Sequence, residues 1–136
     1  MALGFVDVAG DADFRSGSGM LLASDISSGG AMTIAAGGDL RLGAGSRLEA
    51  GRLDATAGGV IDTSMAELAT RGDLDLDADG DLFLGRMSAG GDLGLAGRSL
   101  TLSGDVDAVS LEAAIEQDAR LAAGMRLAGD GSIAAR

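Results

Sequence analysis

Residues 73–85 read "DLDLDADGDLFLG", and their apolar side chains fall on every second position. The residues Leu74, Leu76, Leu82 and Leu84 share one parity, whereas five aspartates share the other. Apolar residues at a period of two are typical of a strand that buries one face. The stretch therefore predicts two short strands, with a turn at the glycine between them.

The phrase Gly-Asp-Leu recurs along the chain, beginning at Gly38, Gly72, Gly80 and Gly91. Related glycines recur at steps of about 20 residues, and the apolar residues between them alternate over only three to five positions. Short strands at a fixed period favour the stacked coils of a solenoid over hairpins. We predict an all-β fold, a parallel β-helix (β-solenoid) of about seven coils of roughly 20 residues, each with two or three short strands.

An aliphatic core follows from the composition, because 46% of the 136 residues are hydrophobic and only three, all Phe, are aromatic. Gly supplies the turns, and the Asp that often follows it can accept hydrogen bonds from nearby backbone N–H groups. Leucines of successive coils are expected to stack in columns inside the solenoid. The predicted inward residues are Leu40, Leu42, Leu48, Leu53, Leu74, Leu76, Leu82, Leu84, Leu93, Leu95, Leu100, Leu102, Leu111, Leu121 and Leu127.

Two segments carry helix-like signals. Residues 64–71 place Ser64 and Glu67 at the spacing of a capping box, and residues 110–123 are rich in helix formers. The apolar residues of the second segment nevertheless alternate as they do in the strands, so we expect both segments to form further turns of the solenoid. A short helix that caps one end of the solenoid is the alternative.

Composition also limits the chemistry. The chain has no Cys and no His, which removes the usual zinc sites and nucleophile constellations. A net charge of −11 disfavours nucleic acid as a partner, and no apolar run is long enough to span a membrane. The first residues lack the pattern of a secretory signal peptide. Trp and Tyr are absent and no carboxylate pair stands out, so we expect no catalytic activity.

The aspartates of residues 73–85 raise the question of a calcium site. Asp75, Asp77 and Asp79 fall at positions 1, 3 and 5 of an EF-hand-type loop, and a glycine follows at position 6. Arg86, however, stands where that loop needs its bidentate acidic residue. We favour a solvated strand, and the alternative calcium ligands are Asp75, Asp77, Asp79 and Asp81. No other cofactor is expected.

Stacking raises an electrostatic question about the aspartates that follow glycine. If they occupy equivalent corners, their carboxylates form a column of like charges, and calcium or mildly acidic pH should stabilise the fold. The aspartates concerned are Asp39, Asp73 or Asp81, Asp92 and Asp105. The integrin tripeptide at residues 71–73 is explained by the recurring Gly-Asp-Leu phrase and is not expected to be a recognition site.

Three phrases resemble the repeats of filamentous haemagglutinin-type exoproteins, the large proteins of bacterial two-partner secretion and contact-dependent inhibition. They are "GGDLRLGAGSRLEAGRLDATAGG", "AGGDLGLAGRSLTLSGDVDA" and "AGDGSIAA". The resemblance covers roughly residues 29–136, and residues 1–28 match least, as a weakly related coil or cap. It implies a right-handed parallel β-helix that serves as a stalk or adhesive fibre outside a Gram-negative cell.

The expected function is therefore structural or adhesive, within a longer exported protein at the cell surface. The implied partners lie on a host-cell or neighbouring-cell surface. Open coil ends also predict end-to-end self-association or further coils of a longer chain. The alternatives are a self-assembling intracellular β-helical filament and a calcium-dependent solenoid module.

Overall fold

The computed structural model describes residues 2–3, 6–22, 25–117, 119–121, 125–127 and 131–135 of the chain. In these residues all regular structure is β, and every strand pair is parallel. The predicted fold class, a parallel β-solenoid, is confirmed. No helix of the described part is long and apolar enough to cross a membrane.

The strands form a seven-stranded sheet, called the front sheet here, and a 12-stranded sheet that supplies two further rows. The front sheet contains β3 (Ala12–Ser16), β6 (Ala31–Ala36), β9 (Arg52–Ala57), β11 (Leu74–Ala78), β13 (Asp92–Gly97), β16 (Ser110–Ile115) and β19 (Gly131–Ala135). The first row contains β1 (Ala2–Leu3), β4 (Met20–Leu22), β7 (Leu40–Leu42), β10 (Ile61–Thr70), β12 (Leu82–Ala89), β14 (Leu100–Leu102) and β17 (Ala119–Leu121). The second row contains β2 (Val6–Val8), β5 (Ile26–Ser28), β8 (Arg47–Ala50), β15 (Val106–Ala108) and β18 (Met125–Leu127), and the later halves of β10 and β12 also belong to it.

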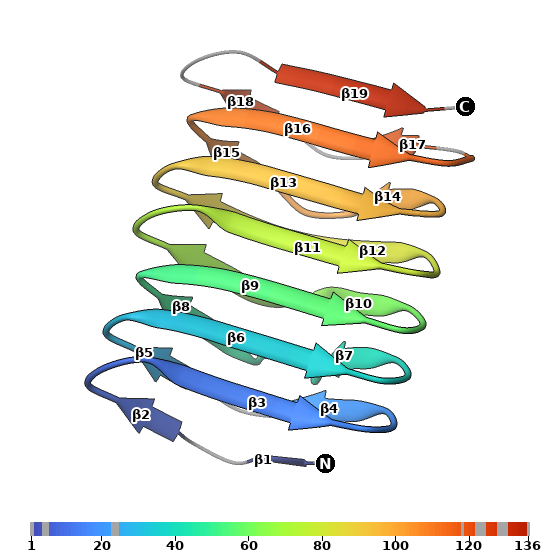
Figure 1. Ribbon diagram of the computed structural model, residues 1–136. Helices are drawn as coiled ribbons and strands as arrows, with labels where there is room; N and C mark the ends of the chain where they lie inside the picture. Colours follow the sequence, from blue (N-terminus) through green and yellow to red (C-terminus); the bar gives the residue numbers. More distant parts are fainter. Residues whose placement is uncertain are drawn as a thin grey trace.

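Each coil thus contributes one strand to each of three faces. In Figure 1 the front strands run from left to right, and the chain returns behind them as it rises from the N-terminus to the C-terminus. This path is a right-handed coil. Paired positions on the front sheet are 18 to 21 residues apart, as for Leu93 with Leu111 and Met32 with Leu53.

The number of coils differs slightly from the seven expected. The solenoid makes about five turns, and β3 and β19 at its two ends bring the front sheet to seven strands. The described strands of residues 1–28 pair with the strands that follow them, so this segment continues the same ladders.

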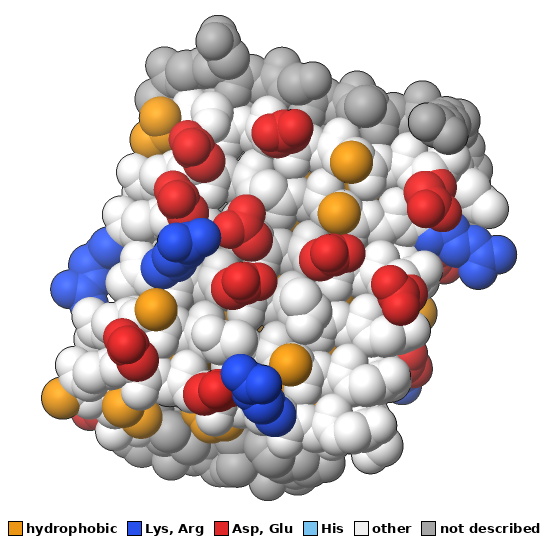
Figure 2. Space-filling model, in the orientation of Figure 1, with side chains coloured by type: hydrophobic (Ala, Val, Ile, Leu, Met, Phe, Trp, Pro, Cys, Tyr) orange, Lys and Arg blue, Asp and Glu red, His pale blue; other side chains and the backbone are white. Residues whose placement is uncertain are grey.

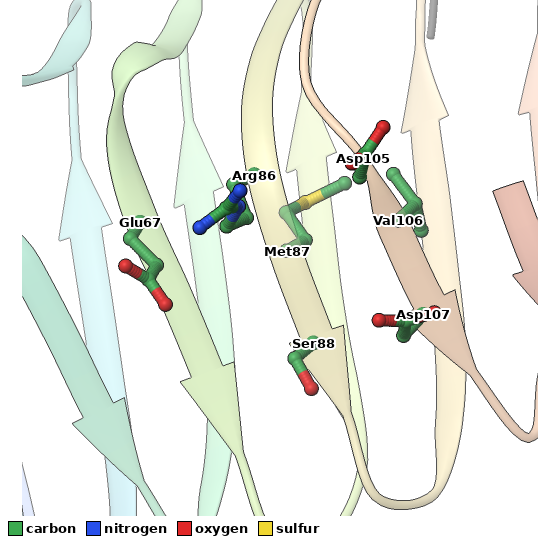
Figure 3. Close-up of a pocket in the computed structure, with 7 residues that line it drawn as sticks. All are labelled: Glu67, Arg86, Met87, Ser88, Asp105, Val106 and Asp107. Carbon is green, nitrogen blue, oxygen red and sulfur yellow. The ribbon is translucent and has the colours of Figure 1, made fainter. Parts of the chain in front are cut away.

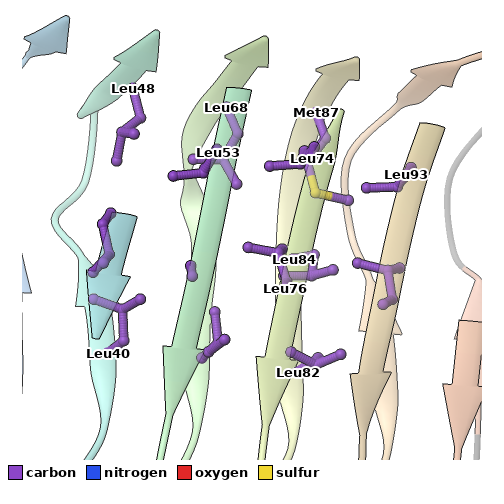
Figure 4. Close-up of a cluster of buried hydrophobic side chains, with 14 of the residues drawn as sticks. Leu40, Leu48, Leu53, Leu68, Leu74, Leu76, Leu82, Leu84, Met87 and Leu93 are labelled. Carbon is purple, nitrogen blue, oxygen red and sulfur yellow. The ribbon is translucent and has the colours of Figure 1, made fainter. Parts of the chain in front are cut away.

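The core consists of stacked aliphatic columns. On the front sheet Met32, Leu53, Leu74, Leu93 and Leu111 occupy paired positions in successive coils, and each is at most 3% exposed. Figure 4 shows such side chains projecting into the space between the faces. A buried Leu contributes about 1.5–3 kcal/mol of transfer free energy, so the columns replace an aromatic core.

The predicted inward leucines are confirmed from Leu40 to Leu111, since all of them are at most 8% exposed. Leu121 and Leu127 lie in described strands, but their side chains are outside the described set. The expectation that both helix-like segments form strands of the solenoid, and not helices, is also confirmed in the described residues. Residues 64–70 belong to β10, and residues 110–115 form β16. Residues 118, 122 and 123 of the second segment lie outside the described residues.

The corner between the first and second rows varies most from coil to coil. Four residues separate β7 from β8, and Gly45 among them adopts a φ of 75°, which favours glycine. In the next coils the pairing shifts between Thr63 and Glu67, so that a bulge of residues 64–66 lies opposite the single residue Gly85. A side chain at Gly85 would come within 2.7 Å of the Ser64 carbonyl oxygen, so only glycine permits this tight corner.

Candidate functional site

The aspartates of residues 73–85 are distributed over a strand and two corners. Asp75 and Asp77 lie on the outward side of β11, between the buried residues of the same strand. Asp73 lies at the corner before β11, and Asp79 and Asp81 flank Gly80 at the corner after it. The alternative calcium ligands therefore do not curl into one loop. The described residues contain no group of three or more acidic side chains placed to hold a metal ion.

Asp75 is engaged by neighbouring coils. Its Oδ2 lies 3.7 Å from Nη2 of Arg52 in the preceding coil. Its Oδ1 occupies the space that a side chain at Gly94 would need in the following coil. The carboxylate thus lies over Gly94, which has no side chain to exclude it. A half-exposed ion pair partly neutralises its charge.

A shallow hollow of about 520 Å³ surrounds this position on the front sheet. Gly94 and Ala96 form its floor, and Asp54, Asp77 and Glu112 stand around it. Figure 2 shows this face, on which acidic side chains clearly outnumber the basic ones. The face presents a broad acidic surface with small residues between the charges, and its hollow is open to solvent.

A second hollow, of about 390 Å³, lies over the second row of the 12-stranded sheet. Buried Met87 and Val106 line it, together with Arg86, Glu67 and Asp105 (Figure 3). Glu67 pairs in register with Arg47 on one side and Arg86 on the other, so charges alternate from coil to coil. Opposite charges on neighbouring strands stabilise a sheet, which gives this column a structural role.

The corner aspartates act as acceptors for the next coil. Oδ1 of Asp11 accepts a hydrogen bond of 2.9 Å from the backbone N–H of Ala31. In the same way Oδ1 of Asp39 accepts from the N–H of Val60, and Oδ1 of Asp73 accepts from the N–H of Asp92, each at 2.9 Å. A side chain at Gly30, Gly59 or Gly91 would overlap the same oxygens. These three Gly pairs thus make room for a carboxylate from the coil before. The predicted hydrogen bonding of Asp to backbone N–H groups is confirmed at these corners.

The predicted single column of aspartates is wrong. Asp39 and Asp81 share one corner, with Val60 between them in the backbone ladder. Asp73 and Asp92 are neighbours at a second corner, and Asp105 lies at a third. The coils differ in length by up to three residues, so equal phrases do not fall on equal corners. These aspartates therefore do not form the single like-charge column from which stabilisation by calcium or acid was expected.

The tripeptide at residues 71–73 lies in the bend between β10 and β11. Its aspartate is bonded to the backbone of the next coil, as described above, which leaves little freedom to reach a receptor.

The arginines that line two of the surface hollows were assigned no binding role from the sequence. Arg86 lines the second hollow, and Arg98 and Arg120 line a third of about 400 Å³. The sequence does carry a signal of this difference, because residue 98 is Arg at the corner position where the earlier coils have glycine. Nε–H of Arg15 donates a hydrogen bond to the Asp13 carboxylate, which raises the pKa of the guanidinium, and this group stays charged in any case.

The fold and its surface define a right-handed parallel β-solenoid with an aliphatic interior and a predominantly acidic exterior. Comparisons with protein-family models, with curated proteins and with solved structures found no match.

Proposed function

We propose that the chain is a structural and adhesive β-helical segment of a secreted bacterial surface exoprotein, and that it is not an enzyme. The observation that carries the proposal is the uninterrupted parallel ladder on three faces, packed around aliphatic columns. Such a rod holds its outer side chains at fixed intervals along its length, which suits a stalk or an adhesive surface. The phrases that resemble filamentous haemagglutinin-type repeats support the same function.

The open ends of the ladder support a role within a longer rod. In the described part of the chain, β3 pairs only with β6, and β19 pairs only with β16. Unpaired strand edges readily pair with another strand. We infer that further coils, from a longer chain or from a second copy, continue the ladder.

The non-catalytic part of the proposal is supported by the surface hollows. They lie on open faces, and the chain has no His or Cys to act as base or nucleophile. Carboxylates are plentiful, but those at the corners are engaged with the backbone.

Adhesion can be tested with beads that carry the purified protein. We expect these beads to attach to host or neighbouring bacterial cells more than beads that carry the Leu74→Asp, Leu82→Asp variant, whose core cannot form. Equal attachment of the two kinds of bead would refute the adhesive function.

The intracellular filament is the second candidate, and the open strand edges favour it as well. Antibody labelling of intact and permeabilised source cells separates the two. Labelling of intact cells supports the surface exoprotein, whereas labelling only after permeabilisation supports the filament.

A further inference from the structure

The repeat changes at the corner that leads from the front sheet to the first row. In three successive coils this corner carries Gly38, Gly59 and Gly80, each bonded through its backbone to the next. The following two coils continue the same ladder with Arg98 and Gln117, whose N–H groups bond to the carbonyl oxygens of Gly80 and Arg98, each at 2.8 Å. Long polar side chains thus replace glycine at this position of the ladder.

This corner is also shorter than its predecessor. Three residues separate Ala78 from Leu82, whereas only two separate Gly97 from Leu100. A side chain at Gly97 would lie 3.0 Å from Cγ of Leu82, so glycine permits the tighter path. The shortening holds Arg98 close against the preceding coil, where an exposed Phe83 is located.

Phe83 and Arg98 both line the third hollow, which has a volume of about 400 Å³. Phe83 pairs in register with Thr101, and Thr101 pairs with Arg120, so the three form one outward column on the first row. Arg98 and Gln117 approach from the corner, and Asp81 completes the rim. Residues from three successive coils therefore converge on one position.

The charges of the hollow contrast with those of the whole chain. Arg98 and Arg120 form no ion pair with any residue that the structure describes, whereas Arg41, two coils before Phe83 on the same row, lies 3.3 Å from Asp39. Two guanidinium groups face a single lining carboxylate, in a protein whose net charge is −11. The lining side chains therefore carry one net positive charge.

We propose that this hollow binds a sugar acid, a polyhydroxylated ligand with one carboxylate. Guanidinium groups bind carboxylates through charge-assisted hydrogen bonds. Asp81 accepts hydrogen bonds from sugar hydroxyls, Gln117 and Thr101 both donate and accept, and the exposed ring of Phe83 packs against the apolar face of the sugar. A single net positive charge suits a monoanion better than a phosphate dianion. The site supplies a ligand for the adhesive function proposed above and deepens that proposal.

The test is a titration of the isotopically labelled protein with glucuronate, followed by NMR. We expect saturable shifts of the Nε–H signals of Arg98 and Arg120 at millimolar ligand. Glucose, which lacks the carboxylate, and acetate, which lacks the hydroxyls, should each bind at least about tenfold more weakly. The variants Arg98→Gln and Arg120→Gln should each weaken glucuronate binding by about tenfold, with unchanged circular dichroism spectra.

Arg41→Gln is the matched control, since it removes the same charge from the same row outside the hollow. It should bind glucuronate as the unmodified protein does. The proposal is overturned if no shift saturates, if acetate or glucose equals glucuronate, if neither hollow variant weakens binding, or if the control weakens it equally. Because no cells are involved, a failed titration leaves the bead result standing, and failed adhesion leaves the titration standing.

Discussion

The Asp39 carboxylate accepts a hydrogen bond of 2.9 Å from the backbone N–H of Val60, which lies one coil further along the chain. Gly59 precedes this amide, and a side chain there would overlap the accepting oxygen. The same arrangement recurs for Asp11 with Gly30 and for Asp73 with Gly91. A side chain in one coil thus determines where the next coil must lack one.

Replacement of Asp39 by Ala is expected to lower the free energy of unfolding by about 1–2 kcal/mol, because the Val60 N–H loses a charged acceptor in a partly buried place. Asp39→Asn should retain most of the stability, since an amide oxygen still accepts. Urea denaturation measures both. Asp77→Ala, on the outward side of β11, is the control and should change stability by less than about 0.5 kcal/mol. Equal losses for Asp39→Ala and the control would contradict the role of the corner bond.

Replacement of Gly59 by Ala should destabilise the protein by about 1–3 kcal/mol, because the new methyl group collides with the Asp39 carboxylate. The loss should be smaller when Asp39 is already Ala, which a double-mutant cycle detects as a coupling free energy. Gly17→Ala is the matched control, since nothing lies within 4 Å of the methyl group it adds. Strictly additive losses at residues 39 and 59 would refute the proposed contact.

Thr63→Val is expected to stabilise the fold by about 1 kcal/mol. Thr63 is 2% exposed and pairs in register with Leu84, and its hydroxyl finds no hydrogen-bond partner among the described residues. Valine has a similar shape and removes the buried polar atom. Thr33→Val, on the outward side of β6, tests whether β-propensity alone is responsible. A higher Tm for the Thr63 variant but not for the control confirms the prediction, and a lower one contradicts it.

Glu67→Lys should destabilise the second row by about 0.5–1 kcal/mol, because it places a cation between the paired positions of Arg47 and Arg86. The loss should shrink in 0.5 M NaCl, where screening shortens the range of the repulsion. Glu112→Lys provides the control, since its register neighbour in the preceding coil is the uncharged Gly94. A loss that does not respond to salt would show that charge alternation is not the cause.

Calcium at millimolar concentration is expected to leave Tm unchanged. Asp75 already lies near Arg52, and Asp77, Asp79 and Asp81 are spread over a strand and a corner. Thermal melts with calcium and with a chelator measure the effect. A rise in Tm that is lost in the Asp75→Asn, Asp77→Asn variant would restore the calcium-dependent module.

The alternation of apolar residues was sufficient to predict which side chains are buried from Leu40 to Leu111, because parity along a strand is a local property. It also separated strand from helix in residues 110–115, since Leu111, Ala113 and Ile115 alternate. The Gly-Asp phrase correctly indicated turns whose carboxylates bond to the backbone.

The tertiary structure alone decided which residues of different coils become neighbours. Coil length varies between 18 and 21 residues, and each change shifts every later phrase to a different place on the perimeter. This is why five similar aspartates occupy three corners, and why Phe83, Arg98 and Arg120 line one hollow. Burial is determined residue by residue along a strand. Register between coils depends instead on the number of residues in each corner, and that number depends on contacts with the preceding coil.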